Sequence, residues 1–220
     1  MPRRVGPRQN MTDPSGARRT IAVLAVAALA LATLLFLSSG SQGWFGPSSG
    51  VRFHGRDVAL EDLGGPFTLS DMSNQPRSLS DFRGKVVLLA FGYTHCPDVC
   101  PTTLAKFAQV RRLLGADGPR VQVLFVTVDP QRDSAELLRN YVPSFDPDFI
   151  GLRGTKAQID AVTKSFHARY EIVDHQGDIV VDHTASTYVI DTRGKTRILT
   201  PYDQPARELA DDVLTLLRSP

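Results

Sequence analysis

The chain has 220 residues, of which 42% are hydrophobic and 22% charged, and it contains two cysteines. This composition excludes a disordered chain, a collagen-like chain and a disulfide-dense mini-protein. The net charge is +2, but five Arg and one Asp give residues 1–20 a charge of +4, which leaves −2 for the other 200. A remainder without excess positive charge gives no reason to expect a nucleic-acid partner.

An uncharged apolar run follows the basic segment. Ile21–Leu37 contains no charge, Gly or Pro, and a helix of this length spans about 25 Å, enough for a thin bilayer core. The arginines precede this run and no basic residue follows it until Arg52. We therefore expect residues 1–20 to be a cytoplasmic tail and 21–37 a single transmembrane anchor, with the rest of the chain outside the cytoplasm. Cleavage as a signal peptide is the alternative, with a small-residue motif at Ala28-Leu29-Ala30.

Residues 38–56 are rich in Gly and Ser, which predicts a flexible linker, and we expect the folded domain at 57–220. At the start of this domain, Pro66–Leu69 and Arg77–Leu79 flank a turn rich in polar residues. This pattern predicts a short hairpin.

Two long apolar runs predict buried strands, each with a helix after it. Lys85–Tyr93 and Val121–Val128 are continuous runs typical of strands covered on both faces. Pro101 suits the first turn of the helix that follows the first strand. That helix has an apolar stripe at Leu104, Phe107, Ala108, Val110 and Leu114. Ser134 and Thr155 are typical N-caps and predict two further helices.

The last third of the chain adds strands and one helix. Ala168–Val173 and Thr187–Ile190 predict strands, and a turn at 191–194 leads to another at Lys195–Leu199. Pro205 opens a final amphipathic helix. Strands alternating with helices, followed by hairpin strands and a helix, predict an α/β layered domain, and this order fits a thioredoxin-like fold.

Both cysteines, Cys96 and Cys100, lie in the segment YTHCPDVCPTTL, directly after a predicted buried strand and at a helix start. α/β folds place functional sites at such positions, and a helix N-terminus lowers the pKa of a thiol. Residues four apart on a helix face the same way, so both sulfurs can converge on one partner. That partner is either the other sulfur, in a disulfide, or a soft metal. A bridge this short constrains the unfolded chain weakly, which disfavours a purely structural disulfide.

Two thiolates are an incomplete metal site, so we expect a third ligand among the five histidines. His183 lies in the segment VDHTAST, just before the predicted strand that starts at Thr187. Thioredoxin-like oxidoreductases usually carry a cis-proline at that point, facing the cysteines, but no proline lies between residues 148 and 200. We therefore predict that His183 is the third ligand. Solvent exposure is expected for His54 and His175, and a structural role at a helix end for His167. His95, next to Cys96, is expected to point away from the helical face.

From about Pro66 to Leu217 the chain resembles the Sco/SenC proteins, membrane-anchored copper proteins that assist assembly of the copper sites of cytochrome c oxidase. The preceding apolar segment also fits this family. The resemblance rests on three further segments: FGYTHCPDVCP from Phe91 to Pro101, VDPQRD from Val128 to Asp133, and DHTASTYVID from Asp182 to Asp191.

The resemblance implies that Cys96, Cys100 and His183 are copper ligands and that Asp129 is an acidic residue near the site that influences its redox and metal behaviour. Two thiolates and an imidazole also suit Cu(I), and an added oxygen ligand would suit Cu(II). The implied partners are the copper-bearing subunit of cytochrome c oxidase and a copper donor protein. The implied location is the cytoplasmic membrane, with the domain on the periplasmic side.

The predicted function is thus that of a copper metallochaperone, which is not an enzyme in the turnover sense. The main alternative is a thiol–disulfide oxidoreductase that uses Cys96 and Cys100 as a redox-active pair. Zinc accepts the same three ligands, although no general base stands out beside them. A peroxidase of the peroxiredoxin type is disfavoured, because Thr94 lies two rather than three residues before Cys96.

Overall fold

The computed structural model describes residues 52–175 and 178–219. The predicted cytoplasmic tail, the predicted anchor at 21–37 and residues 38–51 of the predicted linker lie outside the described residues. Within the described ranges, no helix is both long and apolar enough to cross a bilayer.

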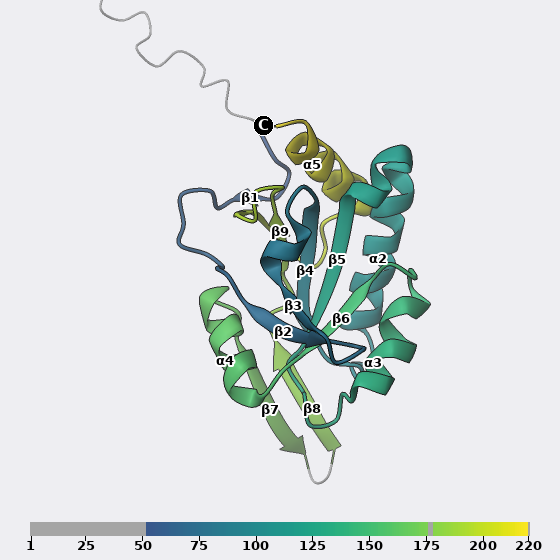
Figure 1. The fold of residues 1–220 in the computed structure, drawn as a ribbon, viewed down its shortest axis with the longest axis vertical. Helices are drawn as coiled ribbons and strands as arrows, with labels where there is room; N and C mark the ends of the chain where they lie inside the picture. The colour runs from purple at the N-terminus through teal and green to yellow at the C-terminus, as the bar shows by residue number, and fades with distance from the viewer. Residues whose placement is uncertain (1–51, 176–177, 220) are drawn as a thin grey trace, which may run out of the picture. The chain divides into compact units, whose positions relative to one another are not determined.

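In the described part of the chain, an eight-stranded mixed sheet forms the middle of the fold (Figure 1). Strand β4 (Val86–Gly92) pairs in parallel with β5 (Val121–Thr127) and antiparallel to β9 (Thr187–Ile190). Every residue of β4 and β5 is buried, which confirms the expectation from their continuous apolar runs. The strand order is β1-β10-β9-β4-β5-β6-β2-β3. The outer strands are β1 (Arg56–Asp57), β2 (Thr68–Asp71), β3 (Pro76–Ser78), β6 (Ile150–Arg153) and β10 (Thr196–Thr200).

Helices pack on this sheet, and α2 and α5 lie side by side (Figure 1). The α-helices are α2 (Val99–Leu113), α3 (Ala135–Tyr141), α4 (Lys156–Ser165) and α5 (Ala206–Arg218), and short 3-10 helices span Leu79–Phe82, Gly115–Arg120 and Val142–Ser144. Both predicted caps are confirmed. The Ser134 hydroxyl accepts a hydrogen bond from the Leu137 amide at 3.1 Å, and Thr155 forms a capping box with Gln158.

A second sheet, of two strands, includes His183, which the sequence analysis had placed in a loop. Strand β7 (Tyr170–His175) pairs antiparallel with β8 (Asp178–His183), and His183 is opposite Tyr170 at the base of this hairpin. The sequence placed His183 in a connection between strands. The structure makes it the last residue of a strand, because the apolar triplet before it pairs with the middle of β7.

The sequence also missed β6, which pairs in parallel with β5. Its four residues include Gly151, which has low intrinsic preference for a strand. Glycine suits this position because α3 packs closely over the strand. A Cβ at Gly151 would lie 3.3 Å from Leu138 Cβ in α3 and 3.2 Å from Val142 Cγ2 just beyond it. Pairing with β5 and β2 and close helix packing therefore support this strand, although its local propensity is low.

The fold takes in residues that the sequence assigned to the linker. Phe53 packs against the core, and β1 joins the edge of the sheet beside β10. The amides of His54 and Gly55 donate to the two carboxylate oxygens of Asp212 in α5, at 2.7 and 2.9 Å. The Gln204 side chain donates to the same carboxylate at 3.0 Å. Asp212, which is 1% exposed, thus attaches the entering chain to the last helix.

We predict that Asp212→Ala lowers the free energy of unfolding by about 2 kcal/mol or more, because it leaves two part-buried amides without their acceptor. Urea denaturation measures this change. The matched control is Asp211→Ala, which removes an exposed carboxylate from the same helix turn and should change the free energy by less than about 0.5 kcal/mol. Equal effects of the two substitutions would contradict the role assigned to Asp212.

Candidate metal centre

The two cysteines lie where β4 passes into α2. Cys96 belongs to the connecting loop, and Cys100 is in the first turn of the helix. Both are free thiols, and the Cys100 amide points to the Cys96 sulfur at an N–S distance of 3.5 Å. Cys96 is half-buried, whereas Cys100 is only 2% exposed. The structure thus holds the two cysteines close together at the helix start, with Cys96 half-buried and Cys100 enclosed.

Close packing fixes Cys100 against the central strand. A Cβ on Gly92 would lie 2.6 Å from Cys100 Sγ and 2.7 Å from the ring of Phe125. The end of β4 therefore has to be glycine for the thiol to lie this near. Ala185 and Ser186 reach the same place from the segment before β9 and line a small cavity together with Cys100.

The electrostatics of Cys100 differ from the sequence expectation. The helix N-terminus suggested a lowered pKa, but burial raises the pKa of this thiol, and negative charge on Cys96 and Asp133 raises it further. A hydrogen bond from the Tyr93 backbone opposes these effects and does not overcome them. Without a metal, Cys100 is therefore a neutral thiol, and a metal ion that binds its sulfur has to displace a proton.

The predicted third ligand can be located only through its backbone. His183 ends β8, and its side chain lies outside the described residues. The next residue, Thr184, is held at the base of the hairpin, where its amide donates to the Arg169 carbonyl at 2.9 Å. Ala185 and Ser186 then line the Cys100 cavity. The described side chains contain no cluster of three or more His, Cys, Asp or Glu suited to a metal ion.

Asp129, the predicted acidic neighbour, lies in the turn after β5. The amide of the preceding Val128 donates to the Gly92 carbonyl at 2.8 Å, so this turn lies against the end of β4. The Asp129 carboxylate is buried and forms an ion pair with Arg132, whose guanidinium lies 5.7 Å from the centroid of the Tyr93 ring. The Asp129 carboxylate is thus held by Arg132, three residues later in the chain.

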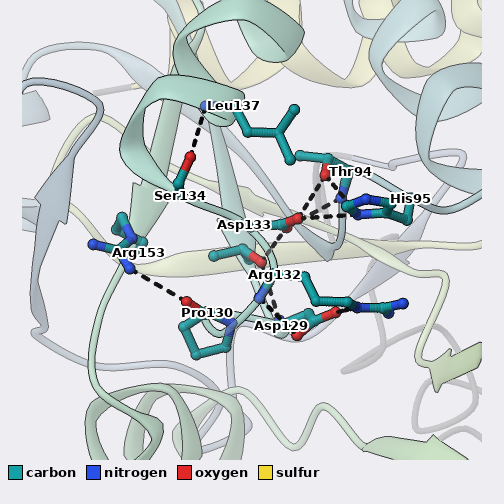
Figure 2. A network of polar contacts seen from close by, with 10 residues as sticks. Thr94, His95, Asp129, Pro130, Arg132, Asp133, Ser134, Leu137 and Arg153 are labelled. Atoms are coloured by element: carbon teal, nitrogen blue, oxygen red, sulfur yellow. Dashed lines mark hydrogen bonds and ion pairs between the residues drawn. The ribbon is translucent and has the colours of Figure 1, made fainter. Parts of the chain in front are cut away.

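A second carboxylate, Asp133, was missed by the sequence analysis and organises the cysteine loop (Figure 2). It is completely buried and accepts hydrogen bonds from the Thr94 amide at 3.1 Å, from the Thr94 hydroxyl and from the Thr127 hydroxyl. His95 Nδ1 lies 3.6 Å from the same group, with half of its side chain exposed. The segment VDPQRD contained this signal, but an Asp beside the Ser134 cap resembles an ordinary helix-start residue.

Of the other histidines, His167 follows α4 with a positive φ of 51° and is exposed, and the exposed His54 contributes its amide to the Asp212 contact. Neither is among the residues that line the Cys100 cavity. The side chain of His175 lies outside the described residues.

A mixed α/β sheet with a thiol pair where its central strand leads into a helix defines a thioredoxin-like protein, which confirms the predicted fold of the domain. The model of the SCO1/SenC family matches residues 56–218. The chain therefore belongs to the SCO1/SenC family, as the sequence resemblance indicated.

Relatives and solved structures agree with this assignment. The mouse mitochondrial SCO1 homolog is 35% identical over 168 residues, covering 74% of this chain and 59% of that protein. The mouse mitochondrial SCO2 homolog is 42% identical over 134 residues, covering 59% and 52%. The chain thus spans little more than half the length of these relatives. ScoI of Bradyrhizobium japonicum with copper bound has a TM-score of 0.65 at 38% identity, covering 70% of this chain and 99% of that one. Yeast Sco1 with copper bound has a TM-score of 0.65 at 30% identity, covering 72% and 90%.

We predict that Asp133→Ala loosens the cysteine loop, because the Thr94 amide and the Thr127 hydroxyl lose a buried charged acceptor. The free energy of unfolding should fall by at least about 2 kcal/mol. Hydrogen exchange of the Thr94 amide should become faster, which mass spectrometry or NMR measures. The exposed Asp98, in the same loop, serves as the control, and Asp98→Ala should cost less than about 1 kcal/mol. Unchanged protection of Thr94 in the Asp133 variant would contradict this role.

Proposed function

We propose that this protein is a membrane-anchored copper metallochaperone, which delivers copper to cytochrome c oxidase or matures its copper site. The observation that carries the proposal is the pair of unbridged sulfurs at the start of α2, with the Cys100 amide 3.5 Å from the Cys96 sulfur. Membership of the SCO1/SenC family supports it, as do the copper-bound structures of the Bradyrhizobium and yeast members.

The donor set fits copper as cargo. Thiolate sulfur is a soft ligand that favours Cu(I), and an imidazole from His183 completes a three-coordinate set. Support for His183 comes from the chain that follows it, because Ala185 and Ser186 line the same cavity as Cys100. Asp129 is the proposed acidic neighbour, at the end of β5 and next to the end of β4.

The unequal burial of the two sulfurs suits the transfer of a metal ion. Cys96 is half-buried, so a ligand from a partner protein can reach it, whereas Cys100 is enclosed by β4 and Phe125. A partner's soft ligand can therefore replace Cys96 first while the Cys100 sulfur still holds the ion. The proposed partners are a copper donor protein and the copper-bearing subunit of cytochrome c oxidase.

The accessible Cys96 also favours a second candidate function, that of a thiol–disulfide oxidoreductase. In that reaction the Cys96 thiolate attacks a partner disulfide and forms a mixed disulfide, releasing one partner thiolate. Cys100 then attacks Cys96, which releases the second partner thiol and leaves an oxidised Cys96–Cys100 bridge. The neutral, buried Cys100 suits the resolving role less well, since it has to lose its proton to react.

The proposed arrangement in the membrane follows the charge pattern of the N-terminal segment. Residues 1–20 remain in the cytoplasm, Ile21–Leu37 spans the cytoplasmic membrane, and the folded domain lies on the periplasmic side. Because the fold includes the chain from Phe53 onward, residues 38–52 remain as the linker between anchor and domain.

We predict that His183→Ala weakens Cu(II) binding more than Cu(I) binding, because Cu(I) tolerates the two remaining thiolates. Loss of one metal–imidazole bond should reduce affinity for Cu(II) by at least about tenfold. Metal titrations of the reduced full-length protein measure both affinities. The matched control is His175→Ala, at the opposite end of the same hairpin, which should bind both ions like the wild-type protein.

The oxidised protein and a reductase assay separate the two candidate functions. Oxidation to a Cys96–Cys100 disulfide removes both thiolates and should lower copper affinity by orders of magnitude. Reduction of a model disulfide needs only the two cysteines, so it should survive in His183→Ala. Unchanged copper binding together with lost reductase activity in that variant would favour the oxidoreductase instead.

The topology has its own test. We predict that a reporter that is active only in the periplasm is active when fused after Pro220, because the arginines before Ile21 retain the N-terminus in the cytoplasm. A reporter that is active only in the cytoplasm serves as the control and should stay silent at the same position. The opposite pair of results would contradict the proposed orientation.

A further inference from the structure

A groove of about 970 Å³ lies between the end of α4 and the base of the β7–β8 hairpin, two elements that are neighbours in Figure 1. The Tyr170 hydroxyl donates a hydrogen bond to the Asp160 carboxylate, which ties the start of β7 to the helix. The groove is therefore bounded by two elements that are attached to each other. Its charged and polar lining residues include Asp160, Lys164, His167, Arg169, Glu171 and Thr184.

This hairpin groove and the cavity beside the buried thiol are lined by successive residues of one segment. Thr184 lines the groove, and Ala185 and Ser186 line the thiol cavity. His183, the proposed third ligand, directly precedes them and pairs with Tyr170, which also lines the groove. A molecule bound in the groove would thus contact the segment that carries this ligand.

Positive charge predominates among the groove side chains that have no ion-pair partner. Asp160 is compensated by Lys156, whose Nζ lies 2.7 Å from its carboxylate. Lys164 and Arg169 are exposed, and neither forms an ion pair with any of the described residues. Glu171 is the other carboxylate of the lining, so these two cations face one anion. An acidic ligand is therefore the best electrostatic match for the groove.

An apolar side chain beside the groove indicates that this ligand is part of a protein. Ile172 keeps 46% of its surface exposed. It lies two residues after Tyr170 in β7, so both side chains point to the same face of the hairpin. In the described part of the chain β7 pairs only with β8, and a hairpin of two strands is marginally stable by itself. A protein that covers Ile172 would bury apolar surface and stabilise the hairpin.

We infer that the hairpin groove binds an acidic segment of the protein that receives the copper ion, the copper-bearing subunit of cytochrome c oxidase. This inference rests on the proposed metallochaperone function. A partner in the groove contacts the segment that carries His183, and a partner that displaces this ligand favours release of the ion over its uptake. The groove therefore suits the receiving protein better than the donor.

The test compares the full-length protein with a double variant that carries Lys164→Glu and Arg169→Glu. Each is loaded with Cu(I) and mixed with the metal-free copper-bearing subunit, and rapid separation followed by metal analysis gives the transfer rate. At low salt we expect transfer from the variant to be about tenfold slower, because like charges then meet at the interface. The difference should shrink at high salt, which screens these charges. The Cu(I) affinity of the variant alone should equal that of the wild-type protein, which also shows that its site is intact.

The matched control carries Lys85→Glu and Lys195→Glu, which change the net charge equally at the other end of the sheet. Lys85 directly precedes β4, whereas the thiols follow the opposite end of this strand. Lys195 follows the turn after β9, and the Gly84 amide donates to the Thr192 carbonyl of that turn at 2.8 Å. Both control residues are exposed, and we expect the control to transfer copper at the wild-type rate.

Three results would overturn the inference while leaving the proposed function intact: transfer at the wild-type rate in the groove variant, an equal loss in the control, or a lower Cu(I) affinity of the groove variant alone. Slower loading from a copper donor protein together with normal delivery would also overturn it and would assign the groove to the donor. A wild-type protein that delivers no copper to the subunit would overturn the proposed function, and the inference with it.

Discussion

The contact between the start of α2 and the end of β4 determines the geometry of the whole site. Cys100 Sγ and the Phe125 ring occupy the space that a side chain at Gly92 would need. The helix can therefore lie directly on the strand, which encloses one thiol and leaves the other at the rim. Any larger residue at position 92 would force the Cys100 sulfur or the Phe125 ring to move. The neutral state of Cys100 depends on this contact, because the burial of the thiol raises its pKa.

Two buried carboxylates hold chain segments that belong to neither a helix nor a strand. Asp133 accepts hydrogen bonds from the loop that leads to Cys96, and Asp212 accepts them from the chain that enters the domain. Neither segment has a strand partner for these amides, so a side chain supplies the acceptor that buried backbone groups require. Asp212 lies in α5, and Asp133 directly precedes the N-cap of α3. Each of these residues thus positions a segment that is remote from it in the sequence.

The sequence predicted the elements whose signals are local. The continuous runs of β4 and β5 and the caps Ser134 and Thr155 were confirmed. The features it missed arise from packing between distant segments. Asp133 becomes a site residue through bonds to Thr94 and Thr127, which no local pattern reveals. The lowered pKa expected for Cys100 was wrong, because the helix terminus is a local effect whereas burial depends on the whole fold. The assignment of His183 as a ligand stays a prediction.

The burial of Cys100 also limits oxidative damage to the thiol pair. A thiol reacts with peroxides as its thiolate, and only when the oxidant can reach it. Oxidation therefore begins at the accessible Cys96, where it gives a sulfenic acid. The Cys100 amide lies 3.5 Å from the Cys96 sulfur, so the Cys100 thiol is close by and, once it has lost its proton, condenses with that group, releasing water and forming a disulfide. The reaction stops at a product that cellular thiols can reverse, before either sulfur reaches the sulfinic stage. The arrangement that holds one sulfur inside the fold thus also makes the pair repairable.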